Sequence, residues 1–232
     1  MQTLKGIVTI NQVSTDVFTA EGLIRKHVSK DELIKEYATG RRDFSREEFE
    51  SQMYLNGANL EGINLNDAKL NGACMIGANL KNASFRNANL KWMDFSNAKL
   101  QGADLHSAQL QNANLYGANL ENANIPYASL ENANLENANI PYASLENACL
   151  RRVSFKNANL RGANLKNANL EEVYFGYANL IDAEGLDTPN TIDNIKYAIF
   201  EHTQVTEKEK AIIADAILQG KFDVINSSTL RK

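Results

Sequence analysis

Residues 156–170 decide the fold, because they repeat one five-residue unit three times: Lys156-Asn-Ala-Asn-Leu-Arg-Gly-Ala-Asn-Leu-Lys-Asn-Ala-Asn-Leu170. The spacing extends in both directions, and every fifth residue from Leu55 to Leu180 is large and apolar. Of these 26 positions 19 are Leu, and the residue two places earlier is Ala in 21 cases. We call these two positions the Leu slot and the Ala slot. One continuous repeat therefore occupies the middle of a chain of 232 residues.

A period of five fits neither a straight helix nor a flat strand. On an α-helix, each step of five residues rotates by a net ~140°, so the Leu side chains would scatter around the surface. On a flat strand, an odd spacing sends successive Leu side chains to opposite faces. All of them stay inward only if the chain turns once per unit. Residues two after each Leu, such as Gly57 and Asn82, tolerate the positive φ of tight turns. The repeat predicts a coil of very short strands joined by turns.

Charged residues indicate how many units complete one turn of the coil. The residue after each Leu lies beside its equivalent one turn away, where opposite charges attract and like charges repel. With three units per turn, three such pairs would be opposite and three alike, whereas with four units all five are opposite. Both slots are enlarged together in three units, and these units share one face only with four units per turn: Met93/Phe95, Val153/Phe155 and Val173/Phe175. We therefore predict a four-sided coil. The five opposite pairs are Glu61/Lys81, Glu131/Arg151, Arg151/Glu171, Glu136/Lys156 and Glu146/Lys166.

This A(N/D)LXX pattern, unbroken over residues 55–180, resembles the pentapeptide repeat family. The resemblance implies an all-β solenoid, namely a right-handed quadrilateral β-helix whose interior is filled by the two slots. At four units per turn the repeat gives about 6.5 coils, or a rod about 31 Å tall at a strand spacing of ~4.8 Å. Residues 32–44 are similar to the lead-in of many cyanobacterial members of the family.

A solenoid exposes its apolar core at both ends and needs caps. We predict an N-terminal, mainly helical cap over residues 1–54, the β-helix over 55–183, and a degenerate last turn plus a C-terminal capping helix over 184–232. In the N-terminal cap, a capping box at 29–32 begins a helix that ends near Gly40. A further helix is expected over 14–28, and a short strand over 7–10. The apolar face of the first helix consists of Leu33, Ile34 and Tyr37.

The transitions at both ends of the repeat follow from its phase. Phe44 and Phe49 keep the period but are one residue out of phase with Leu55, which predicts a bulge or slip before Leu55. After Ala183 the sequence predicts a loop through 188–191. The spacing returns at Ile195, Phe200 and Val205, with Ala198 in the Ala slot. A second capping box, at 206–209, opens a helix to about Gln219 that we expect to cover the last coil. Its expected apolar surface is Ala211, Ile212, Ala216 and Leu218.

The sequence predicts no catalytic, cofactor or metal site. His27, His106 and His202 lie in different regions, whereas a zinc site needs several ligands to converge. Outward side chains on a convex rod do not converge for Ser/His/Asp catalysis, and a filled interior offers no deep pocket. Cys74 and Cys149 lie about 18 Å apart along the axis at the expected strand spacing, too far for a disulfide. We expect a protein without enzyme activity and without a cofactor.

Two other sets of residues have structural interpretations. The abundant Asn residues beside the inward Leu positions are expected to support turns rather than to form a polar binding ladder. Exposed aromatic residues mark a partner surface only when they cluster. On a four-sided coil Trp92, Tyr127 and Tyr142 fall at different corners and heights, so we expect scattered aromatic residues. Tyr116 and Tyr177 are the other exposed aromatic residues expected on the coil.

Charge separates two candidate functions. Some members of the family, the quinolone-resistance proteins among them, imitate DNA and bind type II topoisomerases. Residues 55–183 carry 11 acidic and ten basic side chains. DNA carries one charge per ~1.7 Å, so a 31 Å mimic would need about 18 negative charges. We therefore predict a non-enzymatic protein-binding or scaffold protein, with a DNA-mimicking topoisomerase binder as the disfavoured alternative. A basic belt is the candidate surface patch: Arg151, Arg152, Lys156, Arg161 and Lys166.

Composition limits the setting and the partners. The net charge of −4 is too small to steer nucleic acid by itself, and no apolar run approaches the roughly 18 residues of a membrane span. The first ten residues lack the apolar stretch and cleavage site of a signal peptide. We expect a cytoplasmic monomer or weak dimer that binds another protein, without membrane or nucleic acid.

Overall fold

The structure is a computed structural model that describes residues 17–19, 22–24, 27–50, 52–188, 191 and 198–218. For 17–19, 22–24 and 216–218 it describes the backbone only. The strand expected over 7–10, the inward residue expected at Ile195 and the helix end expected near Gln219 lie outside these residues.

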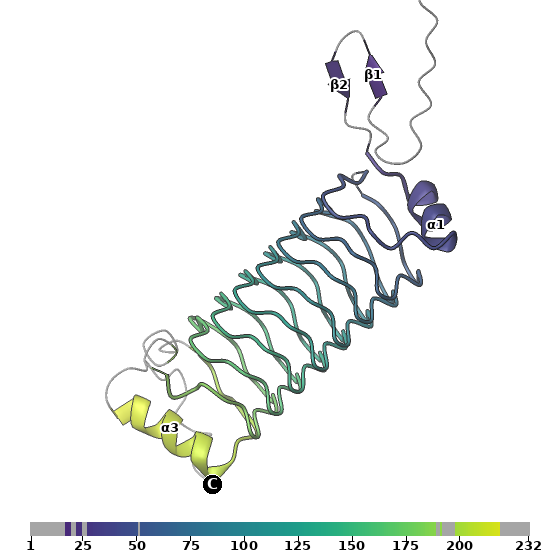
Figure 1. Cartoon of the computed structure of the whole chain (residues 1–232). Helices are drawn as coiled ribbons and strands as arrows, with labels where there is room; N and C mark the ends of the chain where they lie inside the picture. The colour runs from purple at the N-terminus through teal and green to yellow at the C-terminus, as the bar shows by residue number, and fades with distance from the viewer. Residues whose placement is uncertain are drawn as a thin grey trace, which may run out of the picture.

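Residues 43–50 and 52–184 wind into a coil, in which each turn pairs with the next in parallel (Figure 1). From Tyr54 to Glu184 the paired residues are 20 apart, as in Tyr54 with Cys74 and Asn164 with Glu184. One residue per side of the coil makes the pairing, and a two-residue turn follows at each corner. Four units of five residues therefore complete a turn, as predicted. The right-handed winding stays a prediction of the resemblance.

The second residue of each corner has a left-handed backbone conformation. Gly57 has φ 66° and Asn82 has φ 56°, which confirms the predicted turn positions. We call this position the turn slot. Asn fills it most often and Gly next. Gly has no side chain to clash, and the short side chain of Asn tolerates left-handed φ better than other side chains do. Trp92, with φ 61°, occupies the same slot.

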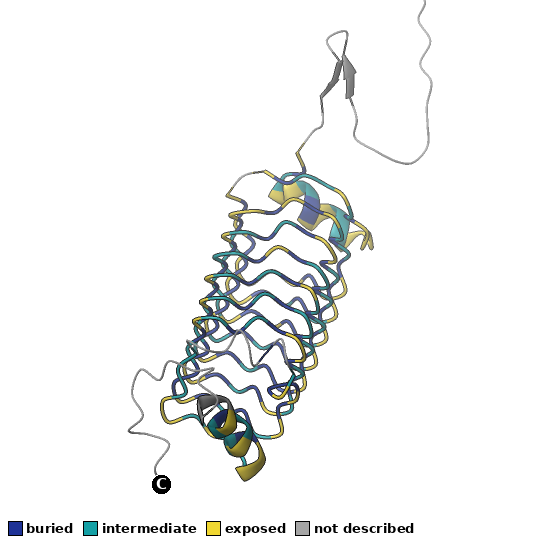
Figure 2. Cartoon of the chain, turned by 90° about the vertical axis from the view of Figure 1, so that its left-hand side faces the viewer, coloured by how far each residue is buried: buried dark blue, intermediate teal, exposed yellow. Residues whose placement is uncertain are grey.

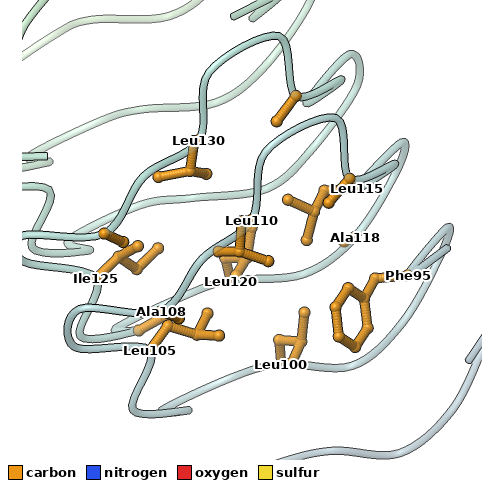
Figure 3. Packing of buried hydrophobic residues seen from close by; sticks show 14 of the residues in the cluster. Phe95, Leu100, Leu105, Ala108, Leu110, Leu115, Ala118, Leu120, Ile125 and Leu130 are labelled. Carbon is orange, nitrogen blue, oxygen red and sulfur yellow. The ribbon is translucent and has the colours of Figure 1, made fainter. Parts of the chain in front are cut away.

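The two inward slots fill the interior of the coil (Figures 2 and 3). Every Leu-slot residue from Leu55 to Leu180 is at most 2% exposed. The Ala-slot residues are buried with one partly buried exception, Ala58. Aromatic rings stack on one side of the interior: the rings of Phe155 and Phe175 lie 5.4 Å apart, and those of Phe175 and Phe200 lie 5.2 Å apart. Phe155 and Phe175 share a face as predicted, whereas Phe85 lies on another.

The coil begins earlier than the predicted boundary at residue 55. Phe44 and Phe49 are buried in the core, and their neighbours Asp43 and Glu48 already pair with residues of the next turn. The turns that begin at Asp43 and Glu48 are one residue longer than the regular turns that follow. One extra residue therefore lies between Phe49 and Tyr54, which confirms the predicted irregularity. The assignment of residues 43–54 to a helical cap was wrong, because the two Phe side chains fill Leu slots.

Helix α1, Lys30–Ala38, lies against the first turns of the coil (Figure 1). Its N-cap is Ser29, whose hydroxyl accepts a hydrogen bond from the Glu32 amide at 3.3 Å. Leu33 is buried, and the Tyr37 hydroxyl donates to the backbone oxygen of Glu61 at 2.7 Å. Ile34 is 38% exposed, contrary to the predicted apolar face. Residues four apart share a helix face, whereas residue 34 lies about 100° away from Leu33.

Residues 17–19 and 22–24 form two paired strands instead of part of the helix predicted over 14–28. Strands β1, Val17–Thr19, and β2, Gly22–Ile24, pair antiparallel. Val17-Phe-Thr19 and Leu23-Ile24 are rich in β-branched and aromatic residues, which favour strands. The helix prediction over these residues was wrong.

The C-terminal end adds one irregular turn and a covering helix. Ile199 and Gln204 pair with Tyr174 and Asn179, so this turn is one five-residue unit longer than the regular turns. Phe200 packs against the core, so the spacing returns as predicted after the insertion. Helix α3, Glu207–Leu218, crosses the end of the coil (Figure 1).

The core contact of α3 differs in part from the prediction. Ile213 is buried in the core and Ile212 packs against it, whereas Ala211 is exposed. The Glu209 carboxylate accepts a hydrogen bond from the Thr206 amide at 2.6 Å, which confirms the second capping box. The side chains of Ala216 and Leu218 lie outside the described residues. No helix in the described part of the chain is long and apolar enough to cross a membrane.

Candidate functional site

The outer surface of the coil consists of four faces and four corners. The residue between each Ala slot and Leu slot points outward at the middle of a face, and equivalent residues stack every 20 positions. We name each face by its first stacked residue: the Tyr54 face, the Asn59 face, the Asn64 face and the Lys69 face. They follow one another around the coil in that order. The Tyr54 and Asn64 faces therefore lie on opposite sides.

The Asn59 face carries a ladder of amide side chains. The Asn79 amide donates to the Asn59 side chain at 2.8 Å, and Asn159 donates in the same way to Asn139 at 2.9 Å. The side-chain oxygen of Asn119 accepts from the backbone amide of Glu121 at 3.0 Å, at the start of the next corner. Lys99 interrupts the ladder. These amides bond to one another and to the turns, in agreement with the expected structural role.

The basic belt surrounds one turn of the coil rather than one face. Four of its five members each follow a Leu slot, so they lie at four successive corners. Four members form ion pairs: Arg151 with Glu131 and Glu171, Arg152 with Glu172, Arg161 with Asp182, and Lys166 with Glu184. Within the described residues, Lys156 alone of the five has no carboxylate within 4.0 Å. The structure therefore does not gather these side chains into one cationic patch.

Two of the five predicted ion pairs form, both of them at Arg151. Its guanidinium lies 2.9 Å from Glu131 and 3.6 Å from Glu171. In the described structure the other three acids accept from an amide or hydroxyl on a face instead of from the lysine one turn away. Asn79 donates to Glu61 at 3.2 Å, for example, in place of Lys81. A short side chain fixed on the face reaches the carboxylate with a smaller loss of side-chain entropy than a lysine would. The other two hydrogen bonds are Ser154 to Glu136 and Asn164 to Glu146.

Hydrogen bonding lowers the pKa of three carboxyl groups on the rod, at Asp43 through the Ser45 hydroxyl and amide, and at Glu172 and Asp104. The hydrogen bond from Arg152 lowers the pKa of Glu172 and raises the pKa of Arg152. At Asp104 partial burial acts to raise the pKa. The hydrogen bonds from Arg86, the His106 amide and Asn124 outweigh it, so the pKa lies below its usual value. Glu172 and Asp104 each bond to an arginine on a neighbouring turn, so both carboxylates help to stabilise the rod.

The three histidines stay apart, as the sequence predicts. His106 contacts the Tyr127 ring at 5.5 Å, and His202 stacks on the Tyr177 ring at 4.8 Å. The Nδ1 atom of His27 lies 3.3 Å from the Phe49 backbone oxygen. Across residues 27–50, 52–188 and 198–215, no three His, Cys, Asp or Glu side chains gather as metal ligands would.

A small hollow of about 180 Å³ lies between the last coil and α3. Lys166 and Glu184 border it from the coil, and Lys208 and Glu209 border it from the helix. It is smaller than the roughly 300–1,000 Å³ of sites that enclose small ligands. Two of the charged residues that border the hollow, Lys166 and Glu184, already form an ion pair with each other at 3.3 Å.

Exposed apolar side chains concentrate on one side of the coil, which the sequence interpretation missed. Trp92, Tyr127 and Tyr142 do lie at different corners, as predicted. However, five of the seven large apolar side chains exposed on the described coil lie on the Tyr54 face or at its corners. Sorting outward residues by their position within the 20-residue turn would have found them. They are Tyr54, Ile76, Trp92, Tyr116 and Tyr177.

Several solved structures are similar to this chain. Rfr23 from the cyanobacterium Cyanothece 51142, a pentapeptide repeat protein, is 31% identical over 45% of this chain and 60% of that chain, with a TM-score of 0.35. A trypsin-treated variant of QnrB1, a plasmid-mediated fluoroquinolone resistance protein, is 18% identical over 79% of this chain and 90% of that chain, with a TM-score of 0.50. HetL from Nostoc sp. strain PCC 7120, involved in heterocyst differentiation regulation, is 24% identical over 77% of this chain and 95% of that chain, with a TM-score of 0.22.

Family models identify the repeat directly. No curated protein matches the sequence. The model of the pentapeptide repeat region matches residues 51–125, and the model of eight pentapeptide repeats matches residues 123–157 and 148–184. Together these matches span more than half of the chain and coincide with the regular part of the coil. The chain therefore belongs to the pentapeptide repeat family.

Proposed function

We propose that this protein is a non-enzymatic protein-binding or scaffold protein that presents rigid rows of side chains to a protein partner. The observation that carries the proposal is the filled interior: the inward slots from 60 to 180 are almost completely buried. A reaction centre needs groups that converge around a substrate. The outward residues of a convex rod diverge instead, which supports surface recognition.

The backbone favours such recognition energetically. Each turn bonds to the next on all four sides, as in the hydrogen bond from the Leu115 amide to the Asn134 oxygen at 2.7 Å. Outward side chains are therefore held at a fixed spacing of ~4.8 Å along each face. A preorganised surface loses less conformational entropy on binding than a flexible one.

Mimicry of DNA is the second candidate, and the ion pairs weigh against it. The likeness to QnrB1 concerns the fold alone. Acidic residues such as Glu131, Glu171 and Glu172 pair with arginines on the rod, so they offer little free negative charge. A gyrase supercoiling assay distinguishes the candidates. Inhibition, or protection from a quinolone, at a small molar excess of the chain would favour mimicry.

Binding to a purified partner tests the proposed function. The tagged chain is used to isolate proteins from the organism that encodes it, and each candidate partner is then purified and titrated by calorimetry. We expect saturable binding with a fixed stoichiometry and no turnover of small molecules. Failure of every purified candidate to bind would contradict the proposal.

A further inference from the structure

The N-terminal half of the Tyr54 face differs from the rest of the rod. It carries an aromatic patch, defined as Tyr54, Ile76, Trp92 and Tyr116. Trp92 is 67% exposed and Tyr54 is 59% exposed. The structure gives neither ring an aromatic partner among the described residues. Four large apolar side chains on four successive turns are therefore open to solvent.

Charge is nearly absent from this half of the face. The residues on the face and its two corners in these four turns lie at 52–57, 71–77, 91–97 and 111–117, and they include only two charged residues, Lys91 and Asp94. The equivalent residues of the next three turns, at 131–137, 151–157 and 171–177, include seven. Asp94 also bonds within the face, accepting from the Ser96 amide at 2.9 Å and from Asn114 at 3.3 Å.

Glycines leave open space beside the aromatic patch. A methyl group added at Gly72 or Gly77 would meet no atom within 4 Å. Gly72 is one turn before Trp92 in the same corner, and Gly77 follows Ile76 directly. The backbone at these two glycines is therefore open to contact by the side chains of a partner. The remaining outward residues here are mainly Asn and Gln. Asn, together with Tyr, Trp and Gly, is enriched in antibody paratopes, which are protein-binding surfaces.

We propose that the aromatic patch is the docking surface for a folded protein whose contacting surface is uncharged and apolar at its centre. The inference rests on the proposed protein-binding function and specifies the face and the partner chemistry. A surface with few charges fits a partner surface that is also uncharged. A nucleic acid or an anionic membrane would need basic side chains on the patch, and an acidic or basic protein would need side chains of opposite charge there. Aromatic residues with few charges are typical of the buried centre of protein interfaces.

The area of the patch argues against a second copy of this chain as the partner. Four turns span about 19 Å along the axis, and five residues span at most ~16 Å across a face, which gives roughly 300 Å². Two flat faces would thus bury less than the ~800 Å² per partner of a stable interface. A contoured partner that also reaches around the corners can bury more.

Matched substitutions test the docking surface without disturbing the fold. Trp92→Asn and Tyr142→Asn both introduce Asn, the residue that occupies the turn slot most often. Trp92 lies in the aromatic patch, whereas Tyr142 lies beside the Asn64 face on the opposite side of the rod. Gly72→Asn and Gly62→Asn form a second matched pair, since both glycines have positive φ and open space. Circular dichroism and thermal unfolding verify that each variant folds.

Photo-crosslinking identifies the partner. Benzoylphenylalanine replaces Asn112 at the patch or Asn122 beside the Asn64 face, both in turn slots where the rod accepts aromatic residues elsewhere. The variants are expressed in the organism that encodes the chain. The protein crosslinked at Asn112 is identified and purified. Its binding is then titrated by calorimetry at 50 and at 500 mM salt, where the electrostatic screening length is about 14 Å and about 4 Å.

We expect one protein to crosslink at Asn112 and not at Asn122. Trp92→Asn and Gly72→Asn should weaken its binding at least tenfold, whereas Tyr142→Asn and Gly62→Asn should change it less than twofold. The affinity should change less than about threefold between the two salt concentrations, because exposed charge pairs contribute little to the contact. Crosslinking of the chain to itself, or a steep dependence on salt, would overturn the inference.

The design separates two failures. If a purified partner binds but only the substitutions beside the Asn64 face weaken it, the proposed function stands and the docking surface is wrong. If no protein crosslinks at either position and none binds the chain, both are wrong.

Discussion

At the scale of single residues, the Ala slot has the strictest packing requirement. Ala118 is completely buried among Leu-slot side chains (Figure 3). We expect Ala118→Leu to overpack the interior and to lower the free energy of unfolding by about 1–3 kcal/mol. Urea unfolding followed by circular dichroism measures the change, with the exposed Asn122→Gly as the control. An unchanged midpoint for Ala118→Leu would mean that the interior has free space.

The turn slot imposes a different requirement, on backbone conformation. Asn132 is exposed and has φ 59°. A β-branched residue there should cost about 1–2 kcal/mol of stability, because its side chain clashes in the left-handed conformation. We expect Asn132→Val to unfold at lower urea than the parent chain, and Asn132→Gly to remain close to it. Equal stability of the two variants would contradict the assigned turn geometry.

Acid should weaken the rod through Asp104. Its pKa in the folded chain lies below the ordinary value of 3.8, and Arg86 bonds to it at 2.8 Å. A lowered folded pKa contributes stability that is complete above the unfolded pKa and is lost as the pH falls through the folded value. Stability measured between about pH 5 and pH 2 should fall less for Asp104→Asn than for the parent chain. Parallel profiles for the two proteins would exclude this contribution.

At the scale of elements, α3 closes the C-terminal end through a small apolar contact. Ile213 is 2% exposed and belongs to the core, whereas Ala211 on the same helix is exposed. We expect Ile213→Ala to lose about 2–5 kcal/mol locally, as other large-to-small core substitutions do. Hydrogen exchange should accelerate at Gln204 and Phe175 in the last turns and stay unchanged at Leu100. Ala211→Ser serves as the control, and uniform acceleration along the rod would show that α3 supports the whole coil.

The elements also differ in how far sequence alone predicts them. Helix α1 follows from the capping box at Ser29, because its signal is local. The strand pair β1–β2 was missed, because six paired residues are too few to establish a period. The phase of Phe44 and Phe49 predicted the irregularity before Leu55, but not that the coil begins before it. The boundary was placed at the start of the unbroken repeat, because two isolated Phe residues do not distinguish an early turn from a cap.

At the scale of the whole molecule, the 20-residue turn explains both the success and the failure of the sequence interpretation. The five-residue period predicts which residues are buried, since Leu55 to Leu180 all point inward only if the chain turns once per unit. The aromatic patch combines residues such as Tyr54 and Trp92, which are far apart in sequence but only two turns apart along the rod. Proximity of this kind becomes visible only after the number of sides is fixed. The sequence did not predict every hydrogen-bond partner. Glu61 accepts from Asn79 rather than pairing with Lys81, because the short Asn79 side chain lies within reach on the same side of the coil.

A disulfide placed between turns tests the four-sided coil most directly. Cys149 pairs with Asn169 on the Lys69 face, one turn away, whereas Asn164 lies only three units further along the sequence and on the Asn64 face. With Cys74→Ser as background, we expect Asn169→Cys to form a disulfide with Cys149 on mild oxidation, because neighbouring strands lie within the ~4.4–6.8 Å that a disulfide spans between Cα atoms. Asn164→Cys should stay reduced under the same conditions. Rapid disulfide formation at 164 and none at 169 would contradict the account.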